Sequence, residues 1–298
     1  MTYSIVAREA ESGYLGVAVQ SHYFSVGSIV TWAESGAGAV ATQSIANPDY
    51  GPRGLALMRD GRGAAEVLAT LVAEDAGREV RQVAMIDARG GVAAHTGDHC
   101  IAAAGHLIGD GFSVQANMMV DDSVVPAMYA GYARAGGDLA DRMLAALDAA
   151  QAAGGDVRGQ QSAAMLIVRD ARSERPWRDV LLELRVEDHP RPLDELRRLL
   201  DMKRAYASVD AGDEALGAGD VERAMSHYQQ ALDLAPDNEE LQFWAAVSLF
   251  KQARETEATD LFRRAFAKHP QLADLVPRVV HLGLVRAEDV ERIVSLRP

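Results

Sequence analysis

Lysine is absent from the first two-thirds of this sequence, because Lys203, Lys251 and Lys268 are its only lysines. A catalytic lysine or a lysine Schiff base is therefore excluded before residue 203. Cysteine occurs once, as Cys100, which excludes an internal disulfide and a multi-cysteine metal site. A glycine-rich phosphate loop and a G-x-S-x-G nucleophile elbow are also missing, so nucleotide chemistry and that type of serine hydrolase are not expected.

Long apolar stretches are missing as well. No run of about 18 apolar residues could span a bilayer, and no basic segment followed by an apolar core could direct export. The net charge of −13 disfavours nucleic acid and anionic membrane surfaces as partners. We therefore expect a cytoplasmic protein with a small-molecule substrate, and neither nucleic acid nor a membrane as partner.

The pattern of apolar residues predicts an α+β domain over residues 1–192. Predicted strands and helices follow in the order strands 3–7, 14–19, 24–32 and 38–44, helices 53–60 and 63–73, strands 81–87 and 91–96, helices 123–135 and 139–153, and strands 162–168 and 180–186. The first connections are too short for crossover helices, so the strands should be antiparallel. Helices on both outer faces of two stacked sheets would give a four-layer αββα sandwich.

The second predicted domain, residues 193–298, shows only helical periodicity and contains a repeat. Four pairs of positions are each 34 residues apart: Ala224 and Ala258, Tyr228 and Phe262, Ala231 and Ala265, and Pro236 and Pro270. This spacing resembles the tetratricopeptide repeat, although the first two positions of the usual pattern are not matched. Two repeats bury little surface, so residues 193–205 and 274–296 should act as caps. The resemblance implies a protein partner for these helices.

Thr2 is the first candidate for chemistry. Its small side chain favours removal of Met1, which would place a hydroxyl and a free α-amine on one residue. An α-amine with a pKa near ~8 can accept the hydroxyl proton at neutral pH, so Thr2 would be both nucleophile and base. The alternative is that Thr2 only opens a strand, where β-branched residues are common.

Other candidates lie where predicted strands end or in glycine-rich loops. Gln43, Ser44 and Asn47 could line an oxyanion site or form an ordinary strand exit. Asn117 could donate its amide to an oxyanion or cap the next turn. Arg158 could hold a substrate carboxylate with Asp156 orienting it, or the two could form a local ion pair in a solvated loop.

No metal or other cofactor is expected. The polar residues between 95 and 106 that could ligate a metal are His95, Asp98, His99, Cys100 and His106. They lack the period of a strand face or a helical turn, and no second cluster complements them. His22 is interpreted as a surface residue of a strand.

The first ~195 residues resemble the family known as domain of unknown function 1028. The matching words, in order, are MTYSIVARE at the start, GVAVQS at 16–21, VATQSIANPDYGPRGL at 40–55, RQVAMIDARG at 81–90, HTGDHC at 95–100, QAN ending at Asn117 and GGDVRGQQSAA at 154–164. The resemblance implies the fold of an N-terminal-nucleophile (Ntn) hydrolase, an αββα sandwich whose nucleophile is the first residue of the first strand.

Carried onto this sequence, the resemblance places the nucleophile at Thr2. It places Gln20 or Ser21 about where the threonine members of the fold have an aspartate, and it leaves the usual catalytic lysine without a counterpart. The resulting hypothesis is an amidohydrolase that acts on a small, carboxylated C–N substrate. The alternative is an inactive fold that recruits a protein partner through its helices, and a symmetric homodimer is the default expectation for either.

Overall fold

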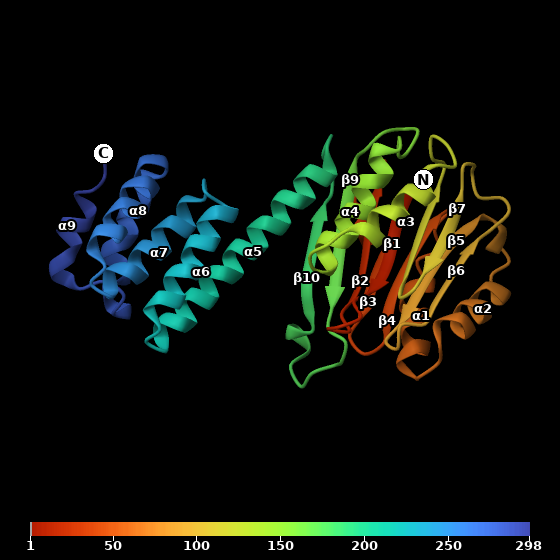
Figure 1. Cartoon of the computed structure of the whole chain (residues 1–298), viewed down its shortest axis with the longest axis horizontal. Helices are drawn as coiled ribbons and strands as arrows, with labels where there is room; N and C mark the ends of the chain where they lie inside the picture. The colour runs from red at the N-terminus through yellow and green to blue at the C-terminus, as the bar shows by residue number, and fades with distance from the viewer. Residues whose placement is uncertain (1) are drawn as a thin grey trace. The chain divides into compact units, whose positions relative to one another are not determined.

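The computed structural model describes residues 2–298 and contains two antiparallel sheets followed by an all-helical region, an α+β architecture (Figure 1). Met1, whose removal the sequence predicts, lies outside the described residues. The chain divides into two compact units, and the boundary between Arg197 and Arg198 lies within helix α5, Pro192–Gly217. Along residues 2–298, none of the helices is both long and apolar enough to cross a bilayer.

The larger sheet of the first unit has six strands, each antiparallel to its neighbours. Their order is β10 (Val180–Val186), β9 (Ser162–Val168), β2 (Leu15–Ser21), β1 (Thr2–Arg8), β8 (Phe112–Asn117) and β7 (Gly105–Gly109). Strand β1 is therefore an inner strand, paired with β2 on one side and with β8 on the other. This double pairing fixes the backbone of Thr2.

The smaller sheet has four antiparallel strands in sequence order: β3 (Thr31–Glu34), β4 (Gly38–Ser44), β5 (Arg81–Asp87) and β6 (Val92–Thr96). Helices α1 (Tyr50–Arg59) and α2 (Ala64–Glu74) connect β4 to β5. Their apolar side chains, including Leu55 and Val67, share a buried cluster with Val40 and Met85 of the strands. The two helices therefore cover one face of this sheet.

The uncovered face of the smaller sheet meets the larger sheet. Val6, Val17 and Val19 of the larger sheet share a buried cluster with Ala39 and Ala84 of the smaller one. The alanines are small, so the two sheets can approach closely and still fill the space between them.

Helices cover the remaining face of the larger sheet. Helix α4 (Leu139–Ala152) contacts β1 and β2, and α3 (Val124–Arg134) contacts β7 and β8 (Figure 1). A Cβ atom at Gly16 would lie 2.6 Å from Sδ of Met143, so glycine is required for α4 to pack this close to β2. The first unit thus has helices on the outer face of each sheet.

The predicted strand over residues 24–32 is largely wrong. The structure has a 3₁₀ turn at Val26–Ser28, and β3 begins only at Thr31. Val26 and Val30 are both buried, and the Val30 N–H donates to the Val26 carbonyl at 3.0 Å. Apolar residues four apart match a helical turn rather than the alternation of a strand. The other predicted elements of this unit agree with the observed ones to within three residues, and β7 lies in a segment that the sequence left unassigned.

The second unit continues α5 with helices α6 (Val221–Leu234), α7 (Glu239–Lys251), α8 (Glu255–Lys268) and α9 (Val290–Val294), and with a 3₁₀ segment at Pro270–Leu282. The repeat positions Ala224, Tyr228, Ala231, Ala258, Phe262 and Ala265 are all buried in one cluster. A Cβ atom at Gly212 would lie 2.5 Å from the Tyr228 ring. Small residues therefore let the helices approach, and the aromatic rings fill the space between them.

Candidate functional site

Thr2 occupies the first position of β1, at one end of the space between the two sheets. It pairs with Ser21 of β2 and with Asn117 of β8, and only 4% of its surface is exposed. Its hydroxyl donates to Oγ of Ser21 at 3.0 Å. Side chains alternate along a strand, and Ser4 reaches the smaller sheet, so Thr2 belongs to the face that looks toward that sheet.

Two amide side chains converge on the backbone of Thr2. Nε2 of Gln43, from the smaller sheet, lies 3.2 Å from the Thr2 carbonyl oxygen, and Nδ2 of Asn117 lies 3.4 Å from the same atom. Gln43 and Asn117 are 1% exposed each. The structure therefore brings two of the predicted site residues, Gln43 and Asn117, within hydrogen-bonding distance of a third, Thr2.

Gln82 joins these two amides, and the sequence analysis gave it no role. Its Oε1 accepts from Nε2 of Gln43 at 2.7 Å and from Nδ2 of Asn117 at 2.9 Å. Its Nε2 donates to the carbonyls of Ala116 at 2.9 Å and Gly105 at 3.1 Å, and to Oγ1 of Thr96 at 3.0 Å. Gln82 is fully buried and lies directly opposite Gln43 in the β4–β5 pair. The available signal was a polar residue directly before the apolar run 83–86 of β5.

The same network extends along the space between the sheets through neutral side chains. Ser4 donates to Oε1 of Gln43 at 2.6 Å and accepts from Nε2 of Gln115 at 2.7 Å, and Ser113 donates to Oε1 of Gln115 at 3.0 Å. We call this set the amide network: Ser4, Gln43, Gln82, Ser113, Gln115 and Asn117. Each member is buried, and each is hydrogen-bonded, as burial of polar groups requires.

The two strands that deliver Gln43 and Asn117 end in strained backbone. Ser44, directly after Gln43, has φ of 71°, and Met118, directly after Asn117, has φ of 56°. Non-glycine residues adopt this left-handed conformation at a cost, and such residues are concentrated at functional sites. Ser44 remains in the sheet, paired with Arg81.

Asp156 and Arg158 form an ion pair beside the end of β2. Nε and Nη2 of Arg158 donate to the Asp156 carboxylate at 3.1 and 2.9 Å, and the N–H of His22, the residue after Ser21, donates to it at 3.2 Å. The Asp156 side chain is fully buried, whereas that of Arg158 is 30% exposed. The pair therefore lies next to the strand that holds the Thr2 hydroxyl, with the guanidinium on the solvent side.

Gln20 lies on the opposite face of β2 from Ser21. It pairs with Tyr3, whose hydroxyl donates to Oε1 of Gln151 in α4 at 2.9 Å, so this face looks toward the helices. Gln20 is fully buried, and its two amide atoms have no hydrogen-bond partner among the described residues. Burial, together with the negative charges of Asp148 and Asp156, raises the pKa of Tyr3 well above its usual value. Tyr3 is therefore a neutral neighbour of the site at physiological pH.

Large apolar side chains are exposed around the end of the first unit where Thr2 lies. They are Tyr23, Phe24, Ile45, Ile101, Val120 and Val157, each 48–63% exposed, and we call them the apolar collar. Met118 links part of the collar: its N–H donates to the Ile101 carbonyl at 2.8 Å, and its carbonyl accepts from the Val157 N–H at 3.4 Å. These backbone bonds place Ile101 and Val157 beside the end of β8, the strand that pairs with Thr2.

Comparison with known proteins gives the first unit a family. The profile of a family of unknown function, DUF1028, matches residues 2–196, which is more than half of the chain. The chain belongs to DUF1028. A tetratricopeptide repeat profile matches residues 215–276. Both resemblances drawn from the sequence are thereby confirmed.

A solved structure supports the same assignment. The crystal structure of a DUF1028 protein from Silicibacter pomeroyi is similar to this chain with a TM-score of 0.60 and 31% sequence identity, and the match covers 67% of this chain and 87% of that one. A search of curated proteins finds no match.

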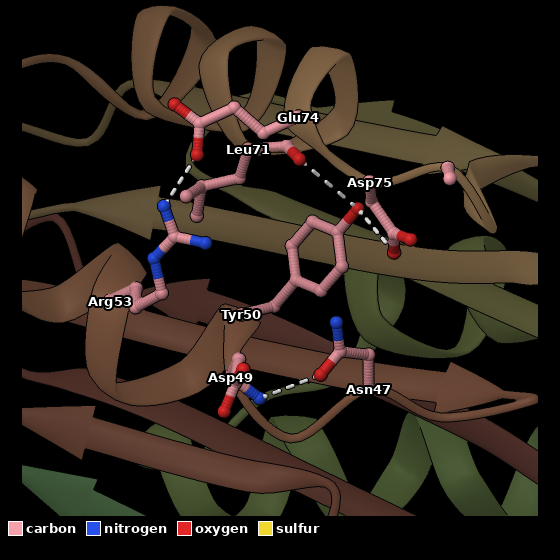
Figure 2. A pocket seen from close by; sticks show the side chains of 8 residues that line it. Asn47, Asp49, Tyr50, Arg53, Leu71, Glu74 and Asp75 are labelled. Carbon is pink, nitrogen blue, oxygen red and sulfur yellow. Dashed lines mark hydrogen bonds and ion pairs between the residues drawn. The ribbon is translucent and has the colours of Figure 1, made fainter.

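Asn47 lies in a different part of the DUF1028 unit, in a pocket of about 160 Å³ beside helices α1 and α2 (Figure 2). Its Oδ1 accepts from the Asp49 N–H at 3.1 Å. The Tyr50 hydroxyl lies 3.2 Å from Oδ2 of Asp75, and burial, followed by the charge of Asp75, raises the pKa of Tyr50 to about 12. The pocket is lined by residues of the helix-covered face, away from the space between the sheets that contains Thr2.

Two histidines of the DUF1028 unit, His95 and His106, make separate hydrogen bonds. His95 Nε2 lies 2.9 Å from the Arg78 carbonyl, and His106 Nδ1 lies 2.8 Å from Oγ1 of Thr96. Burial, with a smaller contribution from His95, lowers the pKa of His106. Within residues 2–298 no three His, Cys, Asp or Glu side chains are arranged to hold a metal ion.

The repeat helices that follow the DUF1028 unit carry a groove of about 510 Å³ between α6 and α8. Tyr228 lies at this groove, and its hydroxyl donates to Oδ1 of Asp213 at 2.6 Å. Leu232 and Leu261 give the groove an apolar part, and Asp233 and Arg264 contribute charges of both signs. Tetratricopeptide-like helices of this kind are suited to contact another protein.

Proposed function

We propose that the DUF1028 unit is an amidohydrolase that cleaves a small C–N substrate with Thr2 as its nucleophile, once Met1 has been removed. One observation carries this proposal: Thr2 begins an inner strand, its hydroxyl is held by Ser21, and its backbone is held by Gln43 and Asn117. We also propose that the unit is a four-layer αββα sandwich of the Ntn-hydrolase type. The order of helices, four-stranded sheet, six-stranded sheet and helices supports this assignment.

In the proposed reaction, Oγ1 of Thr2 attacks the substrate carbonyl carbon while the α-amine of Thr2 accepts the hydroxyl proton. The C–N bond then breaks, the same amine returns the proton to the leaving nitrogen, and an ester forms on Thr2. Water hydrolyses that ester with the amine again acting as base. The side chains of the amide network are neutral and do not act as a base. In this mechanism the base is therefore the α-amine of Thr2, the nucleophilic residue.

The oxyanion would be stabilised by Asn117 and by backbone groups near Ser44. The Asn117 amide makes a bond of 2.9 Å to Gln82 and a longer one of 3.4 Å to the Thr2 carbonyl. A hydrogen bond weakens as it lengthens, so a developing oxyanion can compete for the longer contact. The left-handed backbone at Ser44 lies one residue after Gln43 and supports a specialised role for that strand end.

The proposed substrate combines a carboxylate with an apolar group. Arg158, oriented by Asp156, would bind the carboxylate through its guanidinium. The apolar collar would contact the apolar part, because several of its residues follow closely the ends of the strands that pair with Thr2. Gln43 would position the nucleophile through its hydrogen bond to the Thr2 carbonyl. Gln20 and Asn47 lie on the faces of the two sheets that the helices cover, so in this proposal they do not contact the substrate.

A panel of amides tests this proposal, with released ammonia or amine as the readout. N-acyl amino acids should be hydrolysed by the wild-type chain. Thr2→Ala should abolish turnover while the chain remains folded, and Thr2→Ser should retain part of it, because serine keeps the hydroxyl and the α-amine. Turnover that survives in Thr2→Ala would overturn the proposed mechanism.

A second candidate function is a non-catalytic scaffold that recruits a protein partner through the repeat helices. It is favoured by the absence of lysine before Lys203 and by the groove between α6 and α8. In that case an electrophilic probe would leave Thr2 unmodified, and a partner would be lost on substitution of Leu232 and Leu261 by serine. The homodimer remains a prediction for either function, and light scattering on the purified chain tests it.

A further inference from the structure

We propose that Gln82 is a positioning residue for the Thr2 site. Its carbonyl oxygen holds the amides of Gln43 and Asn117 so that both present N–H groups to the Thr2 backbone. The inference rests on the proposed function, because the positions of Gln43 and Asn117 matter for catalysis only if Thr2 is the nucleophile.

The orientation of the Gln82 amide follows from its surroundings. One end lies 2.9 Å from the Ala116 carbonyl and 3.1 Å from the Gly105 carbonyl. Backbone carbonyls only accept hydrogen bonds, so this end must be the NH₂ group. The other end is therefore the carbonyl oxygen, which faces the smaller sheet's Gln43 and the larger sheet's Asn117.

The orientation of Gln82 dictates the orientation of its two neighbours. Its Oε1 accepts at 2.7 Å from Gln43 and at 2.9 Å from Asn117, so each must direct an NH₂ group toward it. The same NH₂ groups lie 3.2 and 3.4 Å from the Thr2 carbonyl. Without the acceptor on Gln82, Gln43 would keep only its longer contacts of 3.2 and 3.3 Å to the Thr2 and Gln115 carbonyls, and Asn117 only that of 3.4 Å to the Thr2 carbonyl, so both amides would be held less firmly.

The other members of the amide network follow the same polarity. With the NH₂ of Gln43 directed at Gln82, its Oε1 is free to accept from the Ser4 hydroxyl at 2.6 Å. Ser4 in turn accepts from Gln115, and Gln115 accepts from Ser113. The hydrogen bonds therefore run in one direction, with each residue donating to the next, in the order Ser113, Gln115, Ser4, Gln43 and Gln82. Gln82 in turn donates to the backbone carbonyls of Ala116 and Gly105.

Substitution of Gln82 separates hydrogen bonding from space filling. Methionine has a similar length but lacks both the donor and the acceptor. Protonated glutamic acid can still accept from Gln43 and Asn117 and donate one O–H to a backbone carbonyl, whereas the carboxylate form cannot donate. The titratable groups that reach Gln82 along these bonds are His106, through Thr96, and the α-amine of Thr2, whose carbonyl accepts from Gln43 and Asn117. Gln82→Glu should therefore work only while the new carboxyl is protonated.

Two measurements on the full chain test the role of Gln82. The first is proton exchange of the Gln43 and Asn117 side-chain amides by NMR. The second is the rate of Thr2 acylation by an aliphatic β-lactone, followed by intact mass. Gln242→Met is the matched control, because Gln242 is 2% exposed and donates to the Pro236 carbonyl in the other unit.

We expect Gln82→Met to speed both amide exchanges and to slow acylation by about tenfold, as for the loss of a buried hydrogen bond. Gln82→Glu should match the wild type at pH about 5, because burial raises the pKa of a carboxyl above its usual ~4.3. At pH about 9 it should be slower than the wild type, because the carboxylate still accepts from Gln43 and Asn117 but can no longer donate to the Ala116 and Gly105 carbonyls. Gln242→Met should leave both rates unchanged.

The outcomes separate this inference from the proposed function. Amide exchange in Gln82→Met within twofold of the wild-type rate, or identical behaviour of the Met and Glu variants at both pH values, overturns the role of Gln82. A wild-type chain that has lost Met1 and is not acylated overturns the proposed function instead, whatever the amide exchange.

Discussion

Two polar clusters lie on opposite faces of the four-stranded sheet and are built from different chemistry. Gln43 and Gln82 lie between the sheets, almost completely buried, and all of their named side-chain partners are neutral. The pocket beside Tyr50 lies on the helix-covered face and is lined by charged groups, with an ion pair between Arg53 and Glu74 (Figure 2).

The difference follows from the cost of burying charge. An ionised group moved from water into the space between two sheets needs a partner and further hydrogen bonds, whereas a group at the surface keeps its hydration. Amides and hydroxyls can satisfy one another without that cost. A reaction at Thr2 would therefore rely on its own α-amine as base, since the surrounding network offers hydrogen bonds and no charge.

The largest expected effect is the introduction of a charge into the amide network. Gln43→Glu should lower the free energy of unfolding by roughly 3–5 kcal/mol at pH about 8, the usual cost of an uncompensated buried charge. Burial raises the folded-state pKa of the new carboxyl above its unfolded value of about 4.3. The destabilisation should therefore appear as the pH rises above about 4.3 and vanish below it.

Urea unfolding of Gln43→Glu, Gln43→Met and the wild type, at pH about 8 and again below pH about 4.3, measures this effect. The Met variant removes the hydrogen bonds without adding a charge, so its deficit should not depend on pH in this range. A Glu variant as stable as the Met variant at pH about 8 would mean that the space between the sheets tolerates charge.

An intermediate effect is expected at Asp75, where the charge is native. Its side chain is 13% exposed, and its hydrogen bond to Arg81, 2.9 Å long, is the main favourable cause of a pKa below the usual value. Asp75→Asn should cost roughly 1 kcal/mol, discounted for solvent screening at this surface site. The loss should be full above pH about 4 and should shrink as the pH falls through the lowered folded-state pKa.

Denaturant unfolding of Asp75→Asn between acid and neutral pH checks this prediction. Both deficits grow as the pH rises, but over different ranges: the Asp75→Asn deficit changes below pH about 4, whereas the Gln43→Glu deficit changes above pH about 4.3. An Asp75→Asn deficit that kept growing well above pH about 4, as that of Gln43→Glu should, would contradict the contrast between the two clusters.

The smallest effect is expected at the exposed Arg53–Glu74 pair. Both side chains are about half exposed, at 53% and 52%. Glu74→Gln should change the free energy of unfolding by less than about 0.5 kcal/mol, and salt should reduce even that difference. Thermal unfolding at low and high salt measures it, and a loss above about 1 kcal/mol would show that this pair is more than a surface contact.

Most strands and helices of the DUF1028 unit could be predicted because their apolar residues follow regular periods. The segment at Val26–Val30 misled the prediction, since Val26, Ile29 and Val30 lie within a short stretch rich in apolar residues, and the spacing of four between Val26 and Val30 that marks the turn is a single repeat. The repeat helices could be predicted because small and aromatic residues recur every 34 positions, and packing between helices requires that recurrence.

The polar groups around Thr2 were only partly accessible from the sequence. Thr2 faces Ser21 because the two strands form a hairpin with a short turn, so their register can be read locally. Gln82 faces Gln43 across β4 and β5, which two helices separate in sequence, and no local rule fixes that register. Asn47 follows Gln43 closely in sequence, yet Gln43 lies between the sheets and Asn47 lies in a pocket on the helix-covered face.

The central claim is that Thr2 is an N-terminal nucleophile, and one measurement tests it most directly. The purified chain is analysed by intact mass before and after exposure to an aliphatic β-lactone, and the modified residue is located by peptide mapping, with Thr2→Ala as control. The account predicts a chain without Met1 that gains one adduct on Thr2 and gains none in Thr2→Ala. Retention of Met1, or an adduct that persists in Thr2→Ala, would contradict it.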